Sequence, residues 1–261
     1  MLNHDEMVRR QLRRQVERDR ALERGRNPGI FRATNLIGFG AGGLGGIQDP
    51  NYAYAVLAMH METLLDEKGH SMTAVANAAI SSSVFKYGYG SLSCPDANSY
   101  VYGPSSSDWT FGTGDWTVEA WVYITDGGQH TIASNINGQV SQDDLSFQIE
   151  IYTNKIRLTG WSTIWMTSTG TLSNNTWTHV EISRTGTNGY MFINGSLDAG
   201  GAAIGGLNLS NVRNLYIGAF LGGAGTPSGQ LNGGYIDELR IYKGLGKHTS
   251  SFTAPSSRLL P

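Results

Sequence analysis

Acidic side chains are the first candidates for chemistry, because hydrolysis of a glycosidic bond needs two carboxylates facing each other across a groove. Glu119 and Glu150 each stand alone on an expected strand, among Thr, Trp, Gln and Tyr. Asp237 and Glu238 are adjacent, so on a regular strand their side chains point to opposite faces. The sequence therefore predicts no catalytic carboxylate pair. We expect Asp237 to brace a turn by hydrogen bonds.

Metal and nucleophile motifs are equally scarce. The six histidines lack the spacing of a zinc site, and no G-x-S-x-G elbow occurs. Asp96, Asn98 and Asp108 fall in expected loops and are candidate Ca²⁺ ligands, because Ca²⁺ prefers carboxylate and amide oxygens. Ordinary Asx turns explain the same residues. We expect neither an enzyme nor a cofactor, with loop-bound Ca²⁺ as the alternative.

Aromatic side chains are the candidates for glycan binding, since sugars are held by exposed rings with polar groups beside them. Trp121 and Tyr123 lie on the polar phase of one expected strand, and Trp161 and Trp165 fall in the loop-like stretch 160–170. These four residues form the predicted glycan-binding set. The alternative for Trp121 is that it packs under a covering loop.

The N-terminal segment has a different character. Residues 1–26 contain eight arginines, and residues 3–24 have the pattern of a helix with a thin apolar seam. Such a helix buries little surface alone, so we expect it to anchor the chain to a partner through Arg9, Arg10, Leu12, Arg13 and Val16. Acidic residues interleave with the arginines, which favours an acidic protein surface over nucleic acid. No apolar stretch here suits a signal peptide or a membrane span, so we expect a cytoplasmic start and no membrane partner.

Residues 27–50 are rich in glycine and are predicted to be a linker arm. Gly38, Gly40 and Gly43 satisfy G-x-G-x-x-G, but that pattern binds dinucleotides only between a strand and a helix. The following Gly46 and Pro50 argue against such a helix. We therefore expect three segments: a helical anchor over 1–26, a linker over 27–50 and a folded domain over 51–261.

From residue 51 onward the hydrophobic pattern has a period of two. Residues 116–124 and 145–152 alternate apolar with polar side chains, and shorter runs follow at 55–60, 99–102, 155–159, 178–183, 190–193, 215–219 and 235–242. Asn194-Gly195 is a hairpin signal. With 35 glycines and only 15% charged residues, the chain is predicted to be an all-β sandwich or barrel.

The order of several short stretches resembles the laminin-G-like, concanavalin A-like lectin domains of bacteriophage structural and tail proteins. They read KYGYGSL at 86–92, FGTGDWTVEAWV at 111–122, WTHV at 177–180, FING at 192–195, GYIDELRI at 234–241 and FTAP at 252–255. The resemblance covers roughly 200 residues and leaves out the two N-terminal segments. It implies a two-sheet antiparallel jelly-roll sandwich, a fold that serves lectins, glycosidases and structural modules alike.

Two functions fit these features. The first is a bacteriophage virion structural protein: a capsid-decoration, head-fibre or tail-fibre component assembled in the host cytoplasm. Residues 1–46 would bind other virion proteins, and we expect a homo-oligomer, with a trimer favoured. The second is a carbohydrate-binding, lectin-like module that recognises host polysaccharide. The two are compatible if the projecting sandwich is also the adhesin.

Overall fold

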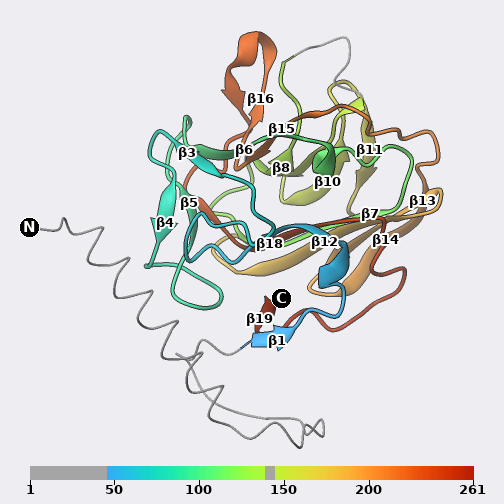
Figure 1. Cartoon of the computed structure of the whole chain (residues 1–261), viewed down its shortest axis with the longest axis horizontal. Helices are drawn as coiled ribbons and strands as arrows, with labels where there is room; N and C mark the ends of the chain where they lie inside the picture. Colours follow the sequence, from blue (N-terminus) through green and yellow to red (C-terminus); the bar gives the residue numbers. More distant parts are fainter. Residues whose placement is uncertain (1–45, 139–144) are drawn as a thin grey trace, which may run out of the picture. The chain divides into compact units, whose positions relative to one another are not determined.

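The computed structural model describes residues 46–138 and 145–261, whose strands form two antiparallel sheets around one apolar core (Figure 1). The all-β, two-sheet sandwich predicted from the sequence is confirmed. The predicted helix over 3–24, with Arg9, Arg10, Leu12, Arg13 and Val16, lies outside the described residues, as does most of the glycine-rich segment.

One sheet has seven strands, in the order β11 (Ile164–Thr167), β10 (Lys155–Thr159), β9 (Gln148–Tyr152), β8 (Gln129–Ser134), β15 (Arg213–Ile217), β6 (Tyr100–Ser106) and β3 (Thr73–Val75). The other has eight: β14 (Ser196–Ala203), β13 (Asn188–Ile193), β12 (Thr178–Thr185), β7 (Trp116–Tyr123), β18 (Gly234–Lys243), β5 (Ser91–Cys94) and β4 (Ala79–Ser81), with β2 (Ala55–Met59) also paired to β18. Two small sheets join β1 (Gly46–Gln48) to β19 (Arg258–Leu260) and β16 (Phe220–Leu221) to β17 (Pro227–Ser228). Short 3₁₀ turns occur at Tyr52–Tyr54, Ser107–Trp109 and Gly223–Gly225.

The core lies between the two large sheets, and strand alternation fills it. Ala120 and Val122 of β7 point inward from one sheet, and Ile149 and Ile151 of β9 point inward from the other. Their polar neighbours therefore face outward, away from the core. This alternation decides which side chains of β8, β9 and β10 are available on the outer face of the seven-stranded sheet.

The hairpin predicted at Asn194-Gly195 is confirmed. The two residues connect β13 to β14 with φ angles of 51° and 78°, the left-handed region that a type I′ turn requires at both central positions. Glycine is needed at the second position for another reason: a Cβ on Gly195 would lie 2.3 Å from the Phe252 carbonyl oxygen.

A β-bulge in β18 corrects one expectation from the sequence. The register shifts between Asp237 and Arg240, and Glu238 has φ 50°. Leu239 enters the core as a result, while Glu238 contacts His60 on the outer side. The prediction that Asp237 and Glu238 point to opposite faces was wrong, because it assumed an unbroken strand.

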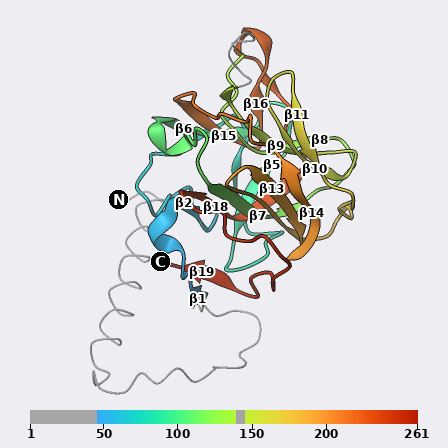
Figure 2. The same cartoon turned by 90° about the vertical axis from the view of Figure 1, so that its right-hand side faces the viewer.

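The folded domain begins at Gly46, within the segment predicted as linker, because the C-terminal residues pair with the strand that starts there. β1 pairs in parallel with β19, from Gly46 opposite Arg258 to Gln48 opposite Leu260 (Figure 2). Asp49, which follows β1, is 4% exposed and accepts a hydrogen bond from the Tyr242 hydroxyl at 2.8 Å. The chain entering the domain is thus fixed to both β19 and β18. Within the described ranges, no helix is long and apolar enough to cross a membrane.

Candidate functional site

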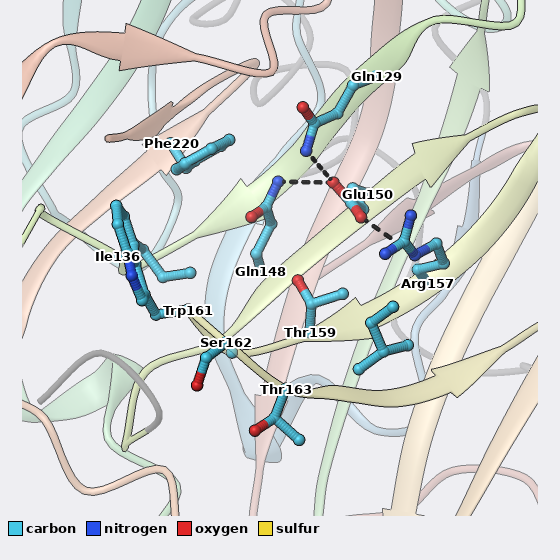
Figure 3. A pocket seen from close by; sticks show the side chains of 12 residues that line it. Gln129, Ile136, Gln148, Glu150, Arg157, Thr159, Trp161, Ser162, Thr163 and Phe220 are labelled. Atoms are coloured by element: carbon cyan, nitrogen blue, oxygen red, sulfur yellow. Dashed lines mark hydrogen bonds and ion pairs between the residues drawn. The ribbon is translucent and has the colours of Figure 1, made fainter. Parts of the chain in front are cut away.

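A groove of about 410 Å³ crosses the outer side of β8, β9 and β10 (Figure 3). We call it the β9–β10 groove. Its lining residues are Gln129, Ile136, Gln148, Glu150, Arg157, Thr159, Gly160, Trp161, Ser162, Thr163, Ile164 and Phe220. Its volume falls within the range of pockets that bind small molecules.

Strand register places the polar residues of this groove side by side. In the pairing of β9 with β10, Glu150 lies opposite Arg157 and Gln148 lies opposite Thr159. Because Ile149 points into the core, the residues on either side of it point outward. The sheet itself therefore fixes an amide, a carboxylate and a guanidinium on one surface.

Glu150 is the centre of the polar set. Its Oε2 accepts hydrogen bonds from Gln129 Nε2 at 2.6 Å and Gln148 Nε2 at 2.9 Å, and its Oε1 lies 3.3 Å from Arg157 Nε. Burial raises the pKa of Glu150, against the opposing effects of the Gln129 hydrogen bond and the Arg157 charge. The Gln148 amide also donates to Thr131 Oγ1 at 3.1 Å. These contacts hold both glutamines in one orientation.

Apolar side chains line another part of the groove. Figure 3 shows Trp161, Ile136 and Phe220 grouped on one side of the glutamines, with Arg157 on the other. Trp161 is half-buried and Ile136 is 1% exposed, so the indole is supported by protein yet still reachable from the groove. An aromatic ring beside fixed amides can pack against the apolar face of a sugar while the amides bond its hydroxyls.

Residues 95–245 match the family model described as the concanavalin A-like lectin/glucanases superfamily. The chain belongs to this superfamily. The matched segment contains every lining residue of the β9–β10 groove. The resemblance noted in the sequence is thus confirmed at the level of the superfamily, without a link to bacteriophage proteins. No curated protein matches the sequence.

Solved structures with the same fold include toxin binding domains. The binding domain of Paraclostridial Mosquitocidal Protein 1 has 13% identity and a TM-score of 0.54, covering 77% of this chain and 50% of that chain. The botulinum neurotoxin serotype D/C VPI 5993 binding domain has 15% identity and a TM-score of 0.53, covering 74% and 50%. A botulinum neurotoxin DC binding domain in complex with rat synaptotagmin II has 15% identity and a TM-score of 0.54, covering 75% and 49%. This chain therefore spans about half the length of these proteins and shares their fold.

Trp121 of the concanavalin A-like domain lies on the other sheet and is covered. It is 7% exposed, its ring contacts Tyr87 edge-on at a centroid distance of 5.8 Å, and Lys86 Nζ lies 3.9 Å from its ring centroid. Asp237 holds the covering loop, because its carboxylate accepts from the backbone N–H of Lys86 at 2.8 Å and of Tyr87 at 3.0 Å. Asp237 thus braces a loop distant in sequence.

The remaining aromatic candidates also lie apart from each other. Tyr123, on β7, packs between Trp177 at 5.6 Å and Tyr235 at 5.7 Å, centroid to centroid, on the eight-stranded sheet. Trp165, on β11, is partly buried against the core. The structure therefore does not bring the four predicted residues together, and Trp161 is the one that lines the groove.

The two carboxylates among the candidate Ca²⁺ ligands, Asp96 and Asp108, contact other protein groups. Asp96 accepts hydrogen bonds from Asn77 Nδ2 at 2.7 Å, from the Asn98 backbone N–H at 2.9 Å and from Ser99 Oγ at 2.8 Å, and the Asn77 bond is the largest cause of its lowered pKa. Asp108 lies 2.9 Å from His70 Nε2. Among the residues that the structure describes, no group of three His, Cys, Asp or Glu side chains could hold a metal ion.

Several groove residues were not singled out from the sequence as binding residues: Gln129, Gln148, Glu150, Arg157 and Phe220. Glu150 was considered only as a lone acid. The alternation of 145–152 does place Gln148 and Glu150 on the polar phase of their strand. It gives no information on which outward face stays open, and that depends on the loops above each sheet.

Proposed function

We propose that this domain binds carbohydrate through the β9–β10 groove. The observation that carries the proposal is the hydrogen-bonded set of Gln129, Gln148 and Glu150, with Arg157 paired to Glu150, beside the indole of Trp161. Carbohydrate presents hydroxyl groups along its edges and C–H groups on its faces, and this groove offers a polar and an aromatic surface together.

The polar set is arranged for binding before any ligand arrives. Both glutamine amides donate to Glu150, which leaves their carbonyl oxygens to accept from sugar hydroxyls. Side chains that are already held lose little conformational entropy on binding, so more of the interaction energy contributes to affinity. A neutral sugar also requires no new charge to be buried, since Glu150 and Arg157 already pair with each other.

The comparisons support a binding role in general terms. The superfamily name covers lectins as well as glucanases, and the similar solved structures are described as binding domains. Among the described residues, Glu150 is the one acid that lines the groove, whereas glycoside hydrolysis uses two carboxylates. Binding without catalysis is therefore the reading we favour, and the absence of enzymatic activity stays a prediction.

A glycan array probed with the purified protein tests the proposal. We expect retention on one or more glycans, and a loss of at least tenfold in affinity for Trp161→Ala, which corresponds to about 1.4 kcal/mol. Trp177→Ala is the matched control, because Trp177 is also half-buried but lies against Tyr123 on the other sheet. Circular dichroism establishes that both variants fold. Unchanged binding by Trp161→Ala, or an equal loss in Trp177→Ala, would contradict the proposal.

The virion role predicted from the sequence rests on residues 1–46, nearly all of which lie outside the described residues. It stays a prediction, as do the homo-oligomeric state and the location in a virion. Carbohydrate binding is compatible with it, because a projecting domain that recognises polysaccharide would attach its carrier to a host surface.

A further inference from the structure

A second hollow, of about 300 Å³, opens at the start of β8. It is lined by Asp126 of the turn between β7 and β8, by His130 of β8, and by the loop between β17 and β18, with Gln230 and Asn232. Its surface is formed mainly by polar side chains and glycine backbone. The function proposed above makes no use of this hollow.

The two hollows adjoin at Gln129, whose side chain lines both. Gly229 reinforces the junction: it lines the second hollow, and a Cβ added to it would lie 2.9 Å from Phe220, which lines the first. The Gly229 carbonyl also accepts a hydrogen bond from the Thr131 backbone N–H at 2.8 Å, which fixes this loop against β8. A ligand in the β9–β10 groove that extends past Gln129 therefore reaches the second hollow.

The second hollow is suited to uncharged hydroxyl groups. Asp126 Oδ1 lies 2.9 Å from His130 Nε2 and accepts from the Gly128 N–H at 2.6 Å, so its charge is already engaged. Within the described part of the chain, the side-chain amides of Gln230 and Asn232 make no hydrogen bond to protein, and they are half-buried and exposed, respectively. Unpaired amides offer both a donor and an acceptor, which match a sugar hydroxyl.

We propose that the β9–β10 groove and this second hollow together bind a neutral oligosaccharide chain, with Gln129 between two successive binding subsites. This inference rests on the proposed carbohydrate-binding function and specifies its ligand as a chain. The guanidinium of Arg157 is paired with Glu150, and the Asp126 carboxylate lies 2.9 Å from His130 Nε2. The two hollows therefore offer no unpaired cation to an acidic sugar, which is why the oligosaccharide should be neutral.

Calorimetric titration with oligosaccharides of two lengths tests this proposal. The probes are cello-, malto-, laminari- and chito-oligosaccharides of two and of six units, with oligogalacturonate as the acidic comparison. In at least one neutral series we expect the hexamer to bind tenfold or more tightly than the dimer, because only the hexamer reaches both subsites.

Variants locate the second subsite. We expect the double variant Gln230→Ala with Asn232→Gly to lower the hexamer affinity to that of the dimer and to leave dimer binding unchanged. Glycine is chosen at position 232 because the native φ of 40° would strain alanine. Asn208→Ala is the control, since Asn208 is an exposed asparagine that lines neither hollow. Trp161→Ala should weaken both lengths.

The outcomes separate this inference from the function on which it rests. Dimer binding that depends on Trp161, with no advantage for the hexamer, would overturn the second subsite and leave carbohydrate binding intact. Equal losses for both lengths in the double variant, a loss in Asn208→Ala, or tighter binding of oligogalacturonate would also overturn it. Failure of every probe to bind, together with a blank glycan array, would refute both proposals.

Discussion

His60 follows β2 and lies between two carboxylates, so its protonation should couple folding to pH. Its Nδ1 is 2.7 Å from Glu238 Oε1, its Nε2 is 3.2 Å from Glu67 Oε1, and the residue is 7% exposed. Burial lowers the pKa of the imidazole and the Arg258 charge opposes protonation, yet the hydrogen bonds with Glu238 and Glu67 prevail and raise the pKa to about 9. The folded protein therefore binds this proton more tightly than the unfolded chain, whose imidazole titrates near 6.5.

The sign and size of the effect follow from these two pKa values. Because the folded value is the higher one, the stabilisation is fully present below pH 6.5 and is lost as the pH rises through 9. At about 1.36 kcal/mol for each pH unit between the two values, the interaction is worth about 3 kcal/mol. About 2.5 kcal/mol of this should disappear between pH 6.5 and pH 9.

Urea unfolding of the wild type and of His60→Gln across this pH range measures the effect. We expect the wild-type free energy of unfolding to fall by about 2 to 3 kcal/mol more than that of the variant between pH 6.5 and 9. Comparing the pH slopes of the two proteins cancels the contributions of the other titrating groups, because both proteins contain them. Asp237 is one such group, since burial raises its pKa to about 7. Parallel slopes for the two proteins would refute the role assigned to His60.

Two further substitutions test a buried hydrogen bond of β18 and the hairpin between β13 and β14. Tyr242→Phe should lower the free energy of unfolding by about 2 kcal/mol, because the hydroxyl lies 2.8 Å from carboxylate oxygens of both Asp49 and Glu119; an unchanged urea midpoint would contradict this. Gly195→Ala should lower the free energy of unfolding by about 2 to 3 kcal/mol, because alanine is strained at φ 78° and its Cβ would collide with the Phe252 carbonyl oxygen. The measurement is the melting temperature, which should fall; a melting temperature equal to that of the wild type would count against the hairpin geometry.

Long alternating strands could be predicted from the sequence because burial on one face forces their pattern. The run from 145 to 152 places Phe147, Ile149 and Ile151 inward, and all three are in the core. The edge strand β14, which reads SLDAGGAA, carries no such pattern because both its faces are partly exposed. β-propensity and periodicity give little signal for strands of this kind.

The site was harder to predict than the fold, as Trp121 and Trp161 show. Both were candidates for glycan binding, with packing under a covering loop as the favoured alternative for Trp121. Tyr87 and Lys86 do cover Trp121, as that alternative predicted, whereas Trp161 lines the groove. The difference arises from a loop held by Asp237, about 150 residues away in sequence. Contacts of that range are set by tertiary packing and leave no local pattern.

The two outer faces differ in how their polar groups are satisfied, and this difference favours one face for binding. On the eight-stranded sheet, the carboxylates of Glu119 and Glu181 are 2% and 0% exposed and pair with Lys247 and His248 of the C-terminal segment. A buried charge left without its partner is strongly destabilising, so that face cannot release its covering segment to admit a ligand at low cost. On the seven-stranded sheet, Glu150 is likewise 2% exposed, but its partners Gln129, Gln148 and Arg157 belong to the sheet itself, and the adjoining groove stays open. Beside this carboxylate, Gln129 is exposed and Arg157 is half-buried, so fixed polar groups stay within reach of a sugar, and this is why we place recognition on this face.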